Sequence, residues 1–207
     1  MDGDRSFMRC GPSVGQPHLA CFGFNVIQPR HPLRAQVEDF IAERYRAAFG
    51  AQVTSFMPTL FALIDEQSNV ISAAGMRRGS EGPLFVEQYL DAPAEVVLAE
   101  RFATPVARSR LVEIGHLSGL GSGNGRRLFP LLAQCLDAEG VDWAVFAATQ
   151  ALRGQFDRMG VRPVPLAPAR AERLGPAAAA WGSYYDTDPW VVGGPLHLGQ
   201  HLLVSAP

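Results

Sequence analysis

The segment "VEIGHLSGLGSGNGRRLFPLLAQCL", residues 112–136, limits the possible folds more than any other part of the chain. A largely apolar, strand-like run enters a stretch with four glycines, and two arginines then open an amphipathic helix. A helix N-terminus exposes unpaired N–H groups, and glycines let the preceding backbone curl around an anion. The segment therefore predicts an α/β domain with a phosphate-binding site at this junction.

The glycine spacing distinguishes between three kinds of phosphate loop. The Walker pattern fails because Arg126 and Arg127 occupy its Lys-Ser/Thr positions, and the dinucleotide pattern fails because Asn124 or Arg126 occupies its third glycine. The pyrophosphate loop of GNAT-type acyltransferases, Arg/Gln-x-x-Gly-x-Gly/Ala, matches in its glycines but has Leu120 at its first position. The alternative is a flexible surface loop. The residues expected at the phosphate site are Leu117, Gly119, Gly121, Gly123, Asn124, Gly125, Arg126 and Arg127.

Hydrophobic periodicity elsewhere predicts alternating strands and helices. The order favours an α/β domain with a mixed β-sheet flanked by helices, residues 21–207, after a loose arm at residues 1–20. The expected strands are 22–27, 60–64, 70–76, 109–117 and 141–149, with further extended segments at 83–90 and on both sides of the turn "DTDP" near residues 184–192. The expected helices are 32–49, 92–103, 126–139 and 150–159.

Charge and composition exclude several classes of function. The net charge of -2 provides no global basic field for nucleic acid. The polar N-terminus does not resemble a signal peptide, and no apolar run approaches the ~20 residues of a membrane span. Cys10, Cys21 and Cys135 lack metal-ligand spacing and suggest reduced thiols. We expect a soluble cytoplasmic protein without a metal.

Six segments, in order, resemble the thermostable hemolysin family. They are "MPTLFALID", "LFVEQYLDAPAE", "VEIGHLSG", "RRLFPLLAQCLDAEGVDWAVFAAT", "LRGQFDRMGVRPVPLAPA" and "WGSYYDTDPWVVGG", and they span about residues 58–194. The resemblance implies a GNAT-like fold, with a layout similar to that of the acyl-homoserine lactone synthases, which use acyl carrier protein as donor. One departure is His116, since the family tends to have Asn after "EIG".

The resemblance also implies a reaction. An acyl group would move from a coenzyme A or acyl-carrier-protein thioester to a small amine or amino acid, with no covalent enzyme intermediate. In this fold a backbone N–H on the strand before the phosphate loop, here 109–117, commonly meets the thioester carbonyl. A carrier-protein donor predicts a basic surface. The arginines that could provide it are Arg77, Arg78, Arg101, Arg126, Arg127 and Arg153.

Two residues on the strand before the loop are candidates for the general base. Glu113 lies in an apolar run, so burial could raise its pKa, and His116 titrates near physiological pH. Three positions apart on a regular strand, the two side chains point to opposite faces, so one of them would face the acceptor. The alternatives are a structural carboxylate tied to an arginine and a structural histidine.

Aromatic and acidic residues elsewhere are further candidates. Glu87 and Tyr89 share one face if their segment is extended, and could line an acceptor pocket with Trp181 and Asp186. Tyr184 or Tyr185 could protonate the leaving thiolate, as a tyrosine often does in GNAT-type enzymes. The alternative for these residues is ordinary packing or surface exposure.

Two other classes of function stay open. A membrane-active lysin, as the family name suggests, would need an amphipathic basic helix, but the helix at 32–49 mixes acidic residues with its arginines. A non-catalytic domain that binds an acyl thioester or a partner is also compatible with the imperfect phosphate loop.

Overall fold

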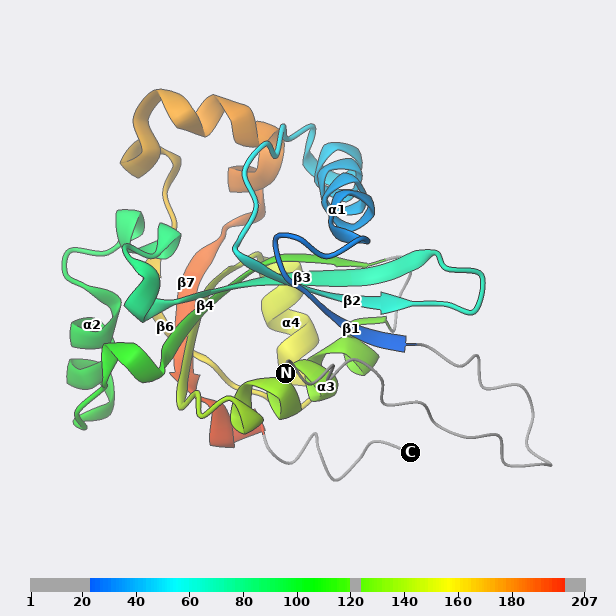
Figure 1. The fold of residues 1–207 in the computed structure, drawn as a ribbon. Coiled ribbons are helices and arrows are strands. Elements are labelled where there is room, and N and C mark those ends of the chain that lie inside the picture. Colours follow the sequence, from blue (N-terminus) through cyan, green and yellow to red (C-terminus); the bar gives the residue numbers. More distant parts are fainter. Residues whose placement is uncertain (1–22, 120–123, 200–207) are drawn as a thin grey trace.

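The computed structural model describes residues 23–119 and 124–199, and the expected N-terminal arm lies outside this range. A seven-stranded mixed sheet in the order β1-β2-β3-β4-β5-β7-β6 forms the centre of the molecule (Figure 1). β4 and β5 are parallel, and all other neighbours are antiparallel. The strands are β1 (Gly23–Ile27), β2 (Thr59–Ile64), β3 (Val70–Arg78), β4 (Leu111–Gly119), β5 (Trp143–Ala148), β6 (Val164–Pro168) and β7 (Trp190–Pro195).

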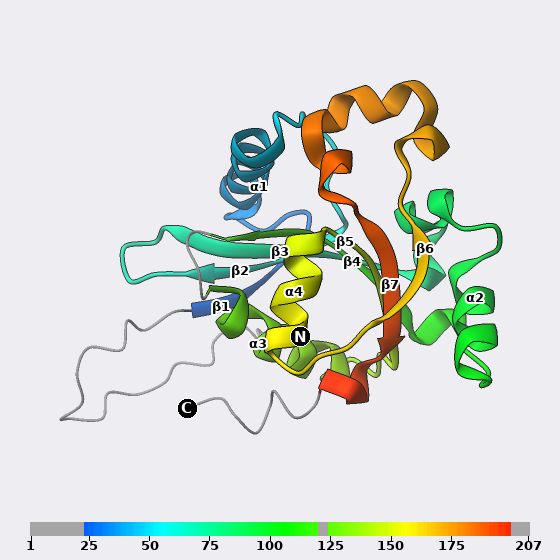
Figure 2. The ribbon, with the colours of Figure 1, turned by 180° about the vertical axis from the view of Figure 1, so that it is seen from behind.

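Helices cover both faces of the sheet. α1 (Arg34–Phe49) and the long 3₁₀ segment η4 (Ala171–Thr187) lie on one face, and α3 (Asn124–Ala138) and α4 (Gln150–Arg158) lie on the other (Figures 1 and 2). The remaining helical elements are η1 (Gly79–Glu81), η2 (Phe85–Tyr89), α2 (Ala94–Phe102), η3 (Arg108–Arg110) and η5 (Leu196–Gly199). The predicted mixed sheet flanked by helices is therefore confirmed.

Alternation along β4 assigns its side chains to the two faces. Val112 and Ile114 pack with α3 and α4 in one apolar cluster, whereas Leu111 packs with α2 and η2 in another. Glu113 follows the alternation and faces the η2 side. The predicted carboxylate in an apolar strand thus points away from the α3–α4 core.

The sheet opens in its middle. β4 and β5 pair over three positions, from Leu111–Trp143 to Glu113–Val145, and then continue to Gly119 and Ala148 without pairing to each other. Ala148 instead pairs with β7. The edge of β4 beyond Glu113 therefore faces a gap between parallel strands rather than a neighbouring strand.

Two predictions of secondary structure were wrong. Residues 83–90 contain the 3₁₀ turn η2 rather than an extended segment, because the carboxylate of Glu87 caps the backbone N–H of Leu84. The segment before "DTDP" is η4, and the outer neighbour of β7 is β6, a strand that the sequence did not suggest. β6 begins and ends near prolines, which is tolerated because it is an edge strand.

Across the residues that the structure describes, no helix is long and apolar enough to span a bilayer. The apolar side chains of α1, the helix considered as a membrane-active segment, pack on the sheet instead: Val37 and Ile41 are both fully buried.

Candidate functional site

A cavity of about 540 Å³ opens on the α1–η4 face of the sheet. Its floor is formed by β3 and β4, and its walls by α1, the connection at residues 52–57, η2 and η4. The polar residues that line it include Arg77, Glu113 and His116. Both candidate bases are therefore in the same cavity.

Glu113 is the buried acid on the cavity floor, with 2% of its surface exposed. Its Oε2 accepts a hydrogen bond from the N–H of Phe85 at 2.6 Å, and its Oε1 accepts one from the N–H of Val86 at 3.1 Å. Burial raises the pKa of the Glu113 carboxyl to about 7, although the two amides and the nearby Arg77 oppose this shift. The expected effect of burial on this pKa is thus confirmed, and the group can take up or release a proton near neutral pH.

A β-bulge brings His116 to the same face as Glu113. Between the pairs Gly75–Gly115 and Ala73–Ser118, two residues of β4, His116 and Leu117, lie opposite the single residue Ala74 of β3. His116 has a φ of 53°. The prediction that Glu113 and His116 point to opposite faces was therefore wrong, because one extra residue shifts the alternation. Histidine and asparagine both tolerate this left-handed backbone better than most residues.

Two facing glycines make room for the side chains of His116 and Met57. A Cβ on Gly75 would lie 2.8 Å from His116 Cδ2, and a Cβ on Gly115 would lie 2.6 Å from Met57 Cε. His116 Nε2 accepts a hydrogen bond from the N–H of Met57 at 3.2 Å. Burial, with help from Arg34 and Arg77, lowers the pKa of His116 to about 4, so the imidazole is neutral and occupied as an acceptor at pH 7.

Arg77 stands directly opposite Glu113 in the β3–β4 ladder and lines the cavity. The one hydrogen bond of its side chain within the described structure is long, 3.4 Å, and goes to the carbonyl oxygen of Pro83. The sequence had suggested Arg77 only as part of a basic surface. No local pattern distinguishes it from Arg78, which points to the other side and pairs with Glu139.

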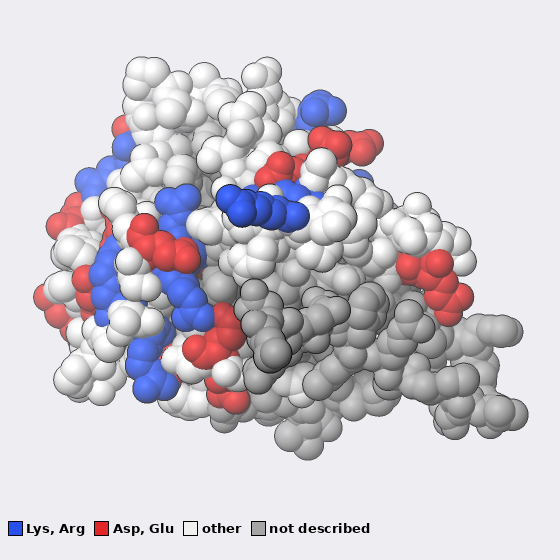
Figure 3. Space-filling model, in the orientation of Figure 1, with Lys and Arg blue, Asp and Glu red and all other residues white. Residues whose placement is uncertain are grey.

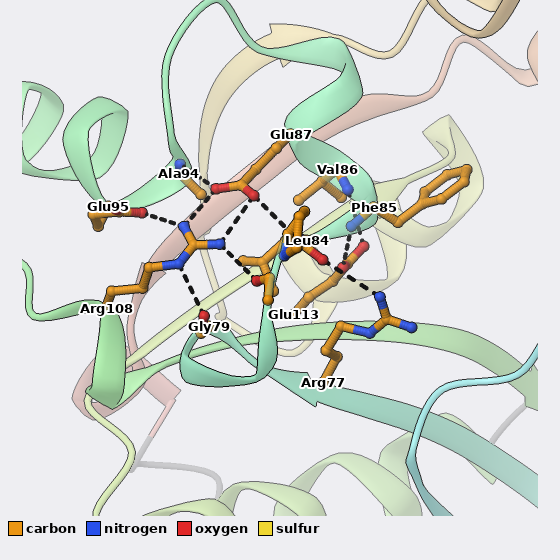
Figure 4. A network of polar contacts seen from close by, with 12 residues as sticks. Arg77, Gly79, Leu84, Phe85, Val86, Glu87, Ala94, Glu95, Arg108 and Glu113 are labelled. Atoms are coloured by element: carbon orange, nitrogen blue, oxygen red, sulfur yellow. Dashed lines mark hydrogen bonds and ion pairs between the residues drawn. The ribbon is translucent and has the colours of Figure 1, made fainter.

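Glu87, by contrast, does not line this cavity. Its carboxylate accepts hydrogen bonds from Arg108, from the N–H of Leu84 and from the N–H of Ala94 (Figure 4). Arg108 also pairs with Glu95 and donates to two backbone carbonyls. Burial alone would raise the pKa of Glu87, but these bonds outweigh it and lower the pKa to about 2. Glu87 is a structural carboxylate that holds η2 in place.

The aromatic candidates and Asp186 divide into residues that line the cavity and residues that lie outside it. Tyr89, Trp181 and Tyr184 line the cavity, and burial raises the pKa of both tyrosines. Tyr185 does not line it, and its hydroxyl is hydrogen-bonded to that of Tyr89 at 2.8 Å. Asp186 is exposed and is also absent from the lining. Three of the five candidates thus share the cavity with Glu113.

The expected phosphate site is described only in part. Gly121 and Gly123 lie outside the described residues, as do the side chains of Asn124 and Arg126, but the backbone places Asn124 at the start of α3. Gly119 ends β4, and the side chain of Leu117 packs against the α3–α4 core. Arg127 is exposed. On the side of the molecule in Figure 3, arginines alternate with acidic residues around α2, while the surface over η4 is mostly uncharged.

A second, apolar cavity of about 110 Å³ lies on the opposite face of the sheet. Leu117, Phe129 and Phe156 line it together with the end of β7. Ile114 lines both cavities. On β5, Phe146 lines the apolar cavity, and Ala147 lines the larger cavity on the α1–η4 face. The two cavities therefore adjoin at Ile114, beside the gap between β4 and β5.

Solved structures share this fold over most of the chain. The acyl-homoserine lactone synthase LasI is 10% identical, with a TM-score of 0.62 over 89% of this chain and 95% of LasI. BjaI, a coenzyme A-dependent acyl-homoserine lactone synthase, is 12% identical, with a TM-score of 0.60 over 88% of each chain. FeeM, an N-acyl amino acid synthase from uncultured soil microbes, is 12% identical, with a TM-score of 0.56 over 86% of this chain and 92% of FeeM.

At these identities the likeness establishes the fold. No curated protein matches the sequence. The model of the family described as thermostable hemolysin matches residues 27–200, most of the chain, and confirms the resemblance of the six segments. The chain therefore belongs to the thermostable hemolysin family.

Proposed function

We propose that the protein is an N-acyltransferase that moves an acyl group from a coenzyme A or acyl-carrier-protein thioester to a small amine. The observation that carries the proposal is Glu113, a buried carboxyl with a pKa near neutrality on the floor of a cavity, beside the gap between β4 and β5. A general base works best when its pKa lies near the working pH. The solved relatives named as coenzyme A-dependent and N-acyl amino acid synthases support this reaction class.

Glu113 is the base in this mechanism. The amine nitrogen attacks the thioester carbonyl, the C–S bond breaks, the amide C–N bond forms, and the amine loses a proton to the Glu113 carboxylate. The departing thiolate takes a proton from Tyr184 or from water. The N–H groups of Phe85 and Val86 hold the carboxylate in one orientation while it remains able to accept that proton. His116 serves as a structural acceptor for Met57.

The donor would enter through the gap between the parallel strands. We place its pyrophosphate or phosphopantetheine phosphate at the junction of β4 and α3, where the N-terminus of a 15-residue helix follows a glycine-rich segment. Its carbonyl would meet the free edge of β4 beyond Glu113, and its acyl chain would enter the apolar cavity past Ile114. The two cavities would then hold acceptor and acyl chain on opposite faces of one sheet.

The experiment is an acyl-transfer assay with acetyl-, octanoyl- and longer acyl donors, each presented on coenzyme A and on acyl carrier protein, with amine acceptors. We expect free thiol and amide to form in equal amounts with wild type, and at least about 100-fold less with Glu113→Gln. Glu100→Gln, an exposed change on α2, is the control and should keep wild-type turnover. Amide formation that is unaffected by Glu113→Gln would refute the assigned base, and no turnover with any donor would refute the function.

A further inference from the structure

The cavity on the α1–η4 face contains few charged groups, and the two that it does contain lie opposite each other in the sheet. Among the described residues that line it, Arg77 is the one permanently charged cation and Glu113 the one carboxyl. They occupy directly opposed positions of an antiparallel ladder, so their side chains leave the sheet on the same face. Burial raises the pKa of Glu113, and the positive charge of Arg77 opposes this shift.

Arg77 is nevertheless without a carboxylate partner in the described structure. The arginines that do form ion pairs there lie elsewhere: Arg34, Arg78, Arg108, Arg110, Arg153 and Arg173. Glu113 is held by the Phe85 and Val86 amides, and the hydrogen bond from Arg77 to Pro83 is long. A half-buried guanidinium on a cavity wall offers several donors in a fork that matches a carboxylate. The cavity thus supplies one anion-binding group next to one proton acceptor.

The upper wall of the cavity is aromatic. Trp181 contacts Phe85, Tyr45 and Tyr184, with ring centroids 5.6, 6.2 and 5.4 Å apart. Ala177 and Ala180 of η4 complete this side. Rings and small aliphatic groups favour an apolar side chain over a charged one.

We propose that the acceptor is an α-amino acid with an aromatic or large aliphatic side chain, whose carboxylate binds Arg77, whose amine lies beside Glu113, and whose side chain packs on Trp181. This inference rests on the proposed acyltransferase function and narrows its acceptor. The same carbon of an α-amino acid carries its carboxylate and its amine, so a single ligand can contact two side chains that leave the sheet on the same face. The donor phosphates, placed at the far end of β4, do not compete for Arg77.

The test compares L-phenylalanine with phenethylamine, which lacks the carboxylate, and with L-glutamate, which lacks the apolar side chain. Calorimetric titration is done with wild type, Arg77→Met and Arg78→Met, each with and without octanoyl-coenzyme A. We expect wild type to bind L-phenylalanine at least about 10-fold more tightly than either analogue. Arg77→Met should reduce L-phenylalanine binding to the level of phenethylamine and leave phenethylamine unchanged. Arg78→Met is the matched control, since Arg78 pairs with Glu139 outside the cavity, and should bind like wild type.

The outcomes also separate this inference from the function itself. Selective binding of L-phenylalanine without acyl transfer from any donor would support the ligand assignment and refute the acyltransferase. Acyl transfer to phenethylamine with the same kcat/KM as to L-phenylalanine, or equal losses in Arg77→Met and Arg78→Met, would overturn the role of Arg77. Failure of any amino acid to bind in either condition would overturn the inference as well.

Discussion

Two carboxylates that both contact the backbone around η2 have opposite electrostatic roles. Glu87 and Glu113 both accept hydrogen bonds from backbone N–H groups around η2, and both appear in Figure 4. Glu87 also binds the guanidinium of Arg108, and its pKa is lowered to about 2. Glu113 is buried more deeply without such an ion pair, and its pKa is raised to about 7.

The difference shows what separates a structural acid from a reactive one. Hydrogen bonds from amides orient both groups, but a paired cation compensates the charge of Glu87, so that this carboxylate remains ionised and fixed. Glu113 carries a charge that costs free energy at neutral pH, and it can therefore exchange a proton there. The Arg108–Glu87 network in turn holds the turn whose amides contact Glu113, so the structural acid positions the reactive one.

The largest expected effect comes from changing Glu113 itself. Because the base must be deprotonated, we expect kcat/KM of wild type to rise with pH through an inflection near 7. Glu113→Gln should lose that inflection along with at least about 100-fold in rate. His116 would give an inflection near 4 instead, since its pKa is lowered to about 4. A pH–rate profile that is flat between pH 5 and 9 would contradict the assignment of Glu113.

Stability should depend on pH through the same residue. The folded-state pKa of Glu113 is raised from 4.5 to about 7, so the folded protein binds more protons than the unfolded chain between these values. The free energy of unfolding should fall as pH rises through this window, by about 3 kcal/mol, and level off above it. Denaturant titrations at pH 5 and pH 8 test this, and Glu113→Gln should be less dependent on pH than wild type.

Removal of the compensating cation should affect the other carboxylate. Arg108→Met leaves Glu87 and Glu95 without their partner, and we expect a loss of about 2 kcal/mol in the free energy of unfolding, since Arg108 is only partly exposed. The contribution of Glu87 is present above pH 4.5 and lost as pH falls through its folded pKa of about 2, so the variant should lose that acid-range dependence. Thermal unfolding between pH 2 and 7 measures both.

A matched control for this change is Arg110→Met, which breaks an ion pair with Asp142 whose two side chains are about half exposed. The expected loss is below about 1 kcal/mol. Equal destabilisation by the two substitutions would contradict the importance of the Arg108 network.

A small effect is also expected from changes at the bulge that brings His116 to the same face as Glu113. His116→Asn suits the left-handed backbone and should cost about 1 kcal/mol for the lost hydrogen bond to Met57. His116→Val adds backbone strain and should cost roughly 1 kcal/mol more. Chemical denaturation of the two variants provides the comparison. Equal stability of His116→Asn and His116→Val would contradict the predicted strain, because it would show that residue 116 does not keep its positive φ in the variants.

Much of the architecture was determined by the sequence itself. Alternating and three-four periodicities specified most strands and helices, and the run from Val112 through the glycines into α3 specified the central β–α unit. These patterns are local, because apolar spacing reflects which face of an element is buried. The burial of Glu113 also followed from its apolar neighbours along the strand.

Only the tertiary structure decided how the candidate residues are combined. The bulge at His116 reverses the face expected from counting, since an extra residue depends on the pairing with β3 rather than on local sequence. Arg77 and Arg78 are equivalent in sequence, and only the register opposite Glu113 places one of them in the cavity. Glu87 does not line the cavity, contrary to the prediction, because Arg108, 21 residues away in the sequence, binds its carboxylate in the folded chain. Each of these depends on contacts between distant segments, which hydrophobic spacing does not encode.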